Sequence, residues 1–388
     1  MTKPRARDLG IPFEGTPGTC NAMTDVPDVT VGYATVIEGP SARTGVTILH
    51  PRGQKNHEPV FAGTFAFNGN GEMTGAAWVE EGGMLEGPIG ITNTHSVGIV
   101  RDTIIDWQAK NDALYQRWSC PVVTETADGW LNDINGFHVK PEHVWYALEN
   151  ARDGSIAEGN VGGGTGMLCY EFKGGTGTSS RKLPDKLGGW TVGALVQSNF
   201  GRRYQLTIAG VPVGDHLKEN TLWGTGENPF RQDDGSLIVI LATDAPLLPH
   251  QLKRLAKRAS LGMARTGSLG GNGSGDIFLA FSTANPGAAR GDEQGLAALH
   301  SLSNNYIDPL LFASAYATEE AIINSMIAAE DMVGYKGLSV KALPHQELKE
   351  IMAQYNRKQE IKDSMDIPKL PHPDDLSGDL QIGDGNIQ

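Results

Sequence analysis

The sequence predicts an α/β fold in which helices are layered on β-sheet, and three patterns indicate it. Short β-rich runs separated by glycine turns dominate the first half of the chain. A continuous apolar and β-branched run at residues 237–243 is typical of a strand buried on both faces. Most of the helical patterns follow that run. We therefore expect helical layers packed against an extended sheet system.

The expected strands lie on both sides of a glycine-rich stretch at residues 160–181. That stretch contains an apolar run at 167–172 and is typical of a hairpin with glycine flanks. A phosphate-binding loop is the alternative there, but no P-loop or dinucleotide-binding glycine pattern is present. The expected strands are residues 46–49, 60–67, 90–94, 192–196, 204–208, 237–243 and 276–283.

Apolar residues at helical spacing predict one helix in the first half of the chain and several in the second. Thr318 is expected to cap the N-terminus of one of them, with Glu319 and Glu320 in its first turn. The expected helices are residues 142–151, 249–263, 295–302, 309–316, 318–333 and 344–355. The polar segment 356–388 has no periodicity and is expected to be an arm ordered on a partner or a disordered tail.

Composition excludes several functional classes. The chain has 388 residues, a formal net charge of -13 and no long basic run, so nucleic acid is not expected as a partner. Its three cysteines are widely spaced and form no Cys-x-x-Cys pattern, which favours a reducing compartment. Residues 1–11 lack the apolar core of a signal peptide, and no stretch is long enough to span a membrane. A cytoplasmic location is expected, with the mature form of a secreted, periplasmic precursor as the alternative.

Common catalytic patterns are missing. The ten histidines include no His-Glu-x-x-His or other pair at metal-ligand spacing, so we expect no metal and no cofactor. The sequence also lacks the Gly-x-Ser-x-Gly turn that carries the nucleophile of many serine hydrolases. A Ser-His-Asp hydrolase is therefore not favoured.

Five motifs occur in a fixed order along the chain. They are Gly15-Thr16-Pro17-Gly18 with Asn21 to Val26, Glu125-Thr126 with Asp128 to Asp133, Val196 to Gly201, Asp233-Asp234-Gly235-Ser236 with the apolar run after it, and Gly270 to Asp276. Asp-Gly-Ser alone is a common turn before a strand. Together the five motifs resemble the L-aminopeptidase D-Ala-esterase/amidase family, which includes the β-peptidyl aminopeptidases, over about residues 9–335.

This resemblance implies a four-layer αββα sandwich of the N-terminal-nucleophile-hydrolase kind. It also implies an inactive precursor that cuts its own chain between Gly235 and Ser236, giving an α subunit of residues 1–235 and a β subunit of residues 236–388. The two subunits make one fold, and members of the family assemble as oligomers of such cleaved heterodimers. Glycine suits position 235 because it has no Cβ to obstruct attack on its carbonyl.

Ser236 is expected to supply both nucleophile and base. Once freed, its α-amino group has a reference pKa of about 8, so it can accept the hydroxyl proton directly or through water. This arrangement belongs to the class of nucleophiles activated by a terminal amine and needs no histidine.

The resemblance assigns roles to four further residues. Asn199 would stabilise the oxyanion, Ser274 and Asp276 would contact the amino group of the nucleophile, and Glu125 would bind the free amino group of the substrate. Some members of the family have glutamate at the position of Asp276 and tyrosine at that of Ala127.

The expected activity is release of N-terminal residues from short peptides, amino-acid amides or esters. One alternative is an autoproteolytic acyltransferase of the ornithine acetyltransferase type, although those enzymes use threonine as nucleophile. Another is a binding protein that keeps the fold, stays uncleaved and has no catalytic activity. Hydrolysis of nylon oligomers by the same mechanism is a further alternative.

Overall fold

The computed structural model describes residues 3–222 and 235–357, and these residues form two main β-sheets. A six-stranded sheet has the order β4-β3-β12-β11-β10-β9, and a four-stranded sheet has the order β1-β2-β5-β6. The strands are β1 (Thr30–Glu38), β2 (Ala42–His50), β3 (Val60–Gly69), β4 (Met84–Leu85), β5 (Ile89–Asn93), β6 (Val122–Thr126), β7 (Leu168–Cys169), β8 (Phe172–Lys173), β9 (Gly175–Lys182), β10 (Thr191–Asn199), β11 (Ser236–Thr243), β12 (Gly275–Ser282), β13 (Met332–Val333) and β14 (Ser339–Val340).

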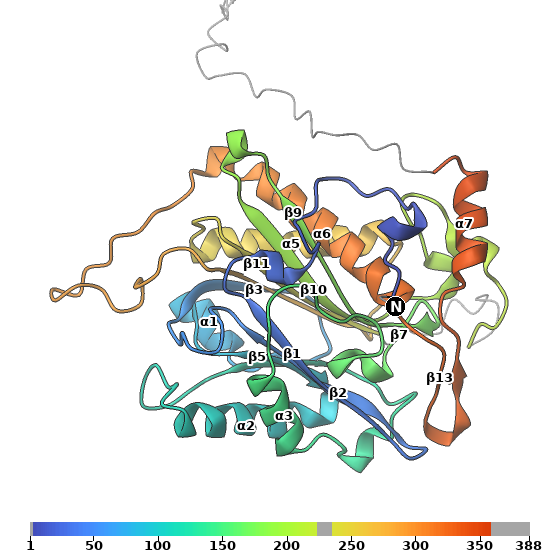
Figure 1. The fold of residues 1–388 in the computed structure, drawn as a ribbon, viewed down its shortest axis with the longest axis horizontal. Helices are drawn as coiled ribbons and strands as arrows, with labels where there is room; N and C mark the ends of the chain where they lie inside the picture. Colours follow the sequence, from blue (N-terminus) through green and yellow to red (C-terminus); the bar gives the residue numbers. More distant parts are fainter. Residues whose placement is uncertain (1–2, 223–234, 358–388) are drawn as a thin grey trace, which may run out of the picture.

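The helices cover the outer faces of both sheets. Figure 1 shows α5 and α6 over the six-stranded sheet and α2 and α3 over the four-stranded one. The helices are α1 (Ala76–Gly82), α2 (Val97–Lys110), α3 (Pro141–Glu149), α4 (Val213–His216), α5 (Pro249–Arg265), α6 (Asp308–Ile327) and α7 (His345–Gln354).

Three hydrophobic clusters separate these four layers. One lies between α5, α6 and the six-stranded sheet and includes Leu237, Leu255 and Ile322. A second lies between the two sheets and includes Ile91 and Ile238. A third, with Val100 and Leu148, packs α2 and α3 on the four-stranded sheet. The expected αββα sandwich is the arrangement observed (Figure 1).

Strand β11 is the buried central strand that its sequence predicts. All its residues are buried, and its neighbours are β10 on one side and β12 on the other. Alternate side chains enter the two different cores, Leu237 on the helical side and Ile238 on the side of the second sheet. Both faces therefore require apolar residues, which explains a run without alternation.

Three predicted elements are wrong. Residues 204–208 form a 3-10 turn (Arg203–Gln205) and an isolated bridge at Ile208 instead of a strand. Residues 295–302 form no helix and are mostly exposed. Leu302 packs against the core but Leu296 and Leu299 are exposed, so the three leucines do not form one buried apolar face. Thr318 is no N-cap, since α6 continues from Asp308 to Ile327 through it.

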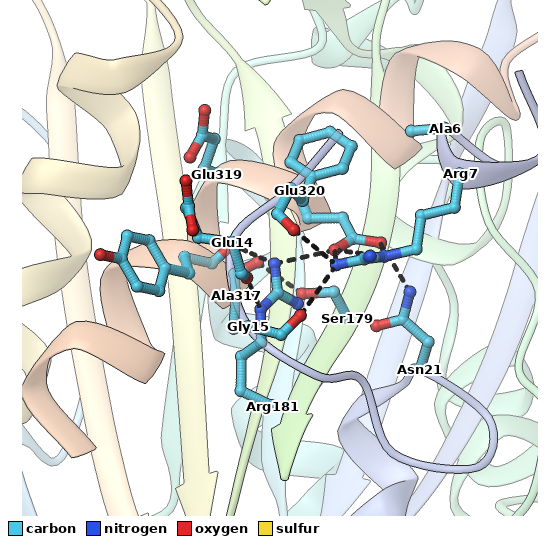
Figure 2. Close-up of polar contacts among 12 residues, drawn as sticks. Ala6, Arg7, Glu14, Gly15, Asn21, Ser179, Arg181, Ala317, Glu319 and Glu320 are labelled. Carbon is cyan, nitrogen blue, oxygen red and sulfur yellow. Dashed lines mark hydrogen bonds and ion pairs between the residues drawn. The ribbon is translucent and has the colours of Figure 1, made fainter. Parts of the chain in front are cut away.

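The N-terminal arm is anchored by buried ion pairs, which also explain the error at Thr318. Figure 2 shows Arg7, Arg181 and Asn21 converging on the carboxylate of Glu320. The side chains of Arg181 and Glu320 are completely buried, and their N–O distance is 2.8 Å. Glu320, which resembled a residue of a helix's first turn, is thus the partner of the buried Arg181 in the middle of α6.

The helix α2 was not predicted from the sequence. It carries buried residues such as Val100, Ile104 and Trp107, but polar residues interrupt its apolar face. Within residues 3–222 and 235–357, no helix combines the length and the apolar character needed to cross a membrane.

Candidate active site

Ser236 is the first residue of β11 and lies at one end of the six-stranded sheet. Its antiparallel register partner on β10 is Asn199, and its parallel partner on β12 is Gly275. Directly opposed residues on neighbouring strands project their side chains from the same face. The side chains of Ser236 and Asn199 therefore share a face, and each residue is 6% exposed.

The residue before Ser236 is held tightly by its backbone. The carbonyl of Gly235 accepts a hydrogen bond from the N–H of Gly275 at 3.1 Å. A Cβ at position 235 would lie 2.5 Å from the Cα of Phe200 and 2.8 Å from the carbonyl oxygen of Asn199. Steric exclusion by Phe200 and by the last residue of β10 is thus a second reason for glycine here. Asp233 and Asp234, which belong to the same motif, lie outside the described residues.

The amide of Asn199 is fixed at both ends. Its Oδ1 accepts a hydrogen bond from the backbone N–H of Leu168 at 2.9 Å, and its Nδ2 donates to the carbonyl of Ala127 at 2.8 Å. A side-chain amide has two N–H donors. The described residues give the second donor no acceptor, so it is available to a group bound beside Ser236.

Ser274 and Asp276 flank Gly275, the strand neighbour of Ser236. The hydroxyl of Ser274 donates to Oδ1 of Asp276 at 2.9 Å, and Nδ2 of Asn68 donates to Oδ2 at 2.9 Å. Both Ser274 and Asp276 are buried. The shorter acidic side chain of this sequence therefore still reaches Ser274.

Glu125 approaches the same region from the four-stranded sheet. Its carboxylate accepts hydrogen bonds from the hydroxyl of Thr94 and from the backbone N–H of Glu72. Burial raises the pKa of Glu125, and these hydrogen bonds only partly oppose the effect. A Cβ at Gly71 would lie 3.1 Å from Oε1 of Glu125 and 3.4 Å from the Cα of Gly275. One backbone position thus contacts both Glu125 and the neighbour of Ser236.

Asp128 secures the turn that carries Ala127. Its carboxylate accepts hydrogen bonds from Nδ2 of Asn93 and from Nδ2 of Asn132, each at 3.0 Å. Burial raises its pKa to about 6. The turn motif singled out this residue in the sequence, and its position beside Ala127 indicates a structural contribution.

The structure brings all the predicted site residues to one end of the sandwich, and it adds two that sequence reasoning missed. Asn68 holds Asp276, and Thr94 holds Glu125. A polar run that begins at the end of β3, Asn68-Gly69-Asn70-Gly71, is the signal that could have located the first. Nothing in the sequence around Thr94 distinguishes it from a surface residue.

The described residues of this site include no group of metal ligands. In the part of the chain that the structure describes, no three His, Cys, Asp or Glu side chains are arranged to hold a metal ion. His143 has a local use, because its Nδ1 accepts the backbone N–H of Lys140 at the start of α3.

Comparison with known proteins identifies relatives over most of the chain. Residues 21–340 match the model of peptidase family S58. The β-peptidyl aminopeptidase BapA of Sphingosinicella microcystinivorans is 50% identical over 371 residues, which cover 91% of this chain and 93% of that protein. BapA of Sphingosinicella xenopeptidilytica is 45% identical over 369 residues, covering 91% of this chain and 92% of that one.

Solved structures give the same result. The L-aminopeptidase D-Ala-esterase/amidase of Ochrobactrum anthropi, described as a variant of the Ntn hydrolase fold, has a TM-score of 0.84 and 48% identity. The match covers 92% of this chain and 100% of that one. A β-aminopeptidase of Burkholderia sp. has a TM-score of 0.82 and 47% identity, covering 90% of this chain and 99% of that one. The expected αββα fold of the Ntn hydrolases is confirmed, and this chain belongs to the aminopeptidases of peptidase family S58.

Proposed function

We propose that this chain is a self-processing serine aminopeptidase and amidase. It cuts itself between Gly235 and Ser236, and the freed Ser236 then releases N-terminal residues through an acyl-enzyme. The observation that carries this proposal is the register of Ser236 between Asn199 and Gly275. Glu125, on the opposite sheet, lies beside Gly71, which in turn lies beside Gly275.

The first step is an acyl shift at the Gly235 carbonyl. The hydroxyl oxygen of Ser236 attacks that carbon, an ester bond forms, the peptide C–N bond breaks and the hydroxyl proton passes to the departing nitrogen. Water then hydrolyses the ester and frees the Gly235 carboxylate and the Ser236 amine. The Gly275 N–H, 3.1 Å from the carbonyl oxygen, supports this step because it stabilises negative charge developing there.

In substrate turnover, the Ser236 hydroxyl attacks the carbonyl of the substrate, and the free α-amine of Ser236 is the base. The free amine of Ser236 accepts the hydroxyl proton, while the Ser274 and Asp276 pair next to Gly275 holds and orients that amine. The second N–H of Asn199 donates to the oxyanion, a contribution of roughly 3 kcal/mol to the transition state. Water completes the cycle by hydrolysing the acyl-enzyme.

Glu125 supplies selectivity for substrates with a free amino group. The buried carboxylate of Glu125 already accepts hydrogen bonds from two neutral donors. An ammonium ion would form a stronger, charge-assisted hydrogen bond with it. The proposed substrates are therefore short peptides, amino-acid amides and esters. β-Aminoacyl amides are the first to test, because the curated relatives above are named β-peptidyl aminopeptidases.

The protein should work without a metal or a cofactor, and we infer that the cleaved heterodimers assemble into an oligomer. Light scattering on the mature protein would measure that oligomer. A cytoplasmic location remains a prediction.

Hydrolysis of paired substrates tests the proposal. Wild-type protein is expected to hydrolyse β-alanine p-nitroanilide and alanine p-nitroanilide and to leave their N-acetylated forms intact. The Ser236→Ala variant is expected to hydrolyse none of them. Equal hydrolysis of acetylated and free substrates, or an active Ser236→Ala variant, would contradict the proposal.

A further inference from the structure

Lys173 on β8 is a buried cation that the proposed mechanism does not use. Lys173 is 0% exposed, and no carboxylate of the described residues forms an ion pair with it. Burial lowers its pKa to about 7. A methionine would fill the same space without the cost of burying a charge, so the ammonium group itself calls for an explanation.

All three ammonium protons have backbone acceptors. Nζ donates to the carbonyls of Gly174 at 2.8 Å, Met167 at 2.9 Å and Gly164 at 3.4 Å. The first carbonyl follows the β7–β8 hairpin, and the other two belong to the glycine-rich turn before it. One side chain thus ties both ends of the hairpin together.

These carbonyls are deep in the protein. A Cβ at Gly164 would lie 2.2 Å from the backbone nitrogen of Thr176, and one at Gly174 would lie 2.5 Å from the carbonyl oxygen of Ser198. Backbone packed this closely admits no water, and buried carbonyls need donors. Lys173 provides donors that the surrounding backbone does not.

The same hairpin sets the amide of Asn199. Leu168 directly follows Met167, and its N–H donates to Oδ1 of Asn199 at 2.9 Å. That bond directs Nδ2 towards the carbonyl of Ala127 and leaves its second hydrogen for the oxyanion. The position of Leu168 therefore determines where the proposed oxyanion donor points.

We propose that Lys173 is a positioning residue for Asn199: its ammonium group fixes the 164–168 backbone, and the Leu168 N–H transmits that position to the amide. The inference rests on the proposed function, in which Asn199 stabilises the oxyanion. Lys173 itself touches no reacting atom.

A double-mutant cycle tests this link, because residues that act through one another show non-additive effects. Mature Lys173→Met is expected to lower kcat about tenfold on β-alanine p-nitroanilide and to change KM less than about twofold, the pattern of a lost transition-state contact. In the Asn199→Ala background, Lys173→Met is expected to change kcat no further. Lys182→Met, at an exposed lysine of the next strand, is the control and should retain wild-type kcat.

Lys173→Gln retains two N–H donors and should give an intermediate kcat, and it replaces the methionine variant in the cycle if that variant does not fold. Where a variant does not mature, the rate of chain cleavage replaces kcat. Effects of the Lys173 and Asn199 substitutions that multiply, or an unchanged kcat in Lys173→Met, would overturn this inference alone. Wild-type kcat in Asn199→Ala would instead overturn the proposed role of Asn199.

Discussion

Glu125 is a carboxylate that must be ionised to bind an ammonium group, although its burial opposes ionisation. Burial raises its pKa above the ordinary value of 4.5. Protonation therefore begins to remove the binding charge at a higher pH than it would for an exposed glutamate. Substrate binding should therefore be strongest above this raised pKa, where Glu125 is ionised, and should weaken as pH falls through it.

Glu125→Gln is expected to lower kcat/KM for a free-amine substrate about 100-fold, equivalent to about 2.7 kcal/mol, mainly through KM. The variant should also lose the acidic rise in KM seen in wild type. Steady-state kinetics between pH 4 and pH 9 would measure both effects. Glu81→Gln, which removes an exposed carboxylate on α1, is the control. Identical pH profiles in wild type and Glu125→Gln would contradict the assignment.

The site residues differ in how far the sequence could reveal them. Ser236, Asn199, Ser274, Asp276 and Glu125 lie in motifs, so their types and order were visible before the structure. Their convergence depends on strand register, which no local pattern encodes. The polar run at Asn68 marks that residue, but its pairing with Asp276, 208 residues away, depends on the tertiary fold. The acceptors of Lys173 are close in sequence, yet only the folded hairpin turns their carbonyls towards its ammonium group.

At the scale of elements, the sequence located strands and helices with strong periodicity and failed where tertiary contacts override local signals. The run at β11 and the amphipathic face of α5 were predicted correctly. The break proposed within α6 was wrong because Glu319 and Glu320, taken as the first turn of a helix, are paired with arginines from other segments. Local acidic residues cannot reveal partners so distant in sequence.

Glu320 offers a stability test of that correction. Burial raises its pKa, but Arg181 and Arg7 outweigh this effect, and the net pKa lies below the ordinary 4.5. The carboxylate thus stabilises the fold above its unfolded pKa, and this contribution is lost as pH falls through the lower folded pKa. Glu320→Gln leaves Arg181 buried without a counter-charge and should lower the free energy of unfolding by about 3 kcal/mol at pH 7.

Urea unfolding at pH 7 and pH 4, at one fixed protein concentration, would measure the difference in free energy of unfolding between wild type and Glu320→Gln. That difference should be smaller at pH 4 than at pH 7. The control is Glu330→Gln, which removes a surface ion pair with Lys3 and should cost less than about 1 kcal/mol. Equal destabilisation by the two substitutions would contradict the stabilising contribution of the buried cluster.

At the scale of the whole molecule, the proposed cut passes through one sheet. Strands β11 and β12 follow residue 235, yet they lie between β3 and β10, which precede it. The helices α5 and α6, also from the second part, cover that sheet (Figure 1). Fragments 1–235 and 236–388 therefore share one core and should not separate without loss of the fold.

Native size-exclusion chromatography of the cleaved protein should give a single peak that contains both fragments in equal amounts. Denaturing electrophoresis of that peak would resolve them. Separate elution of the two fragments under native conditions would contradict a shared sheet.

The measurement that tests the central claim most directly is the intact mass and N-terminal sequence of the purified protein beside its Ser236→Ala variant. The account predicts two wild-type fragments, the smaller beginning Ser-Leu-Ile-Val, and a variant that remains one chain. A wild-type chain that stays whole after prolonged incubation would contradict self-processing and favour a binding protein without catalytic activity.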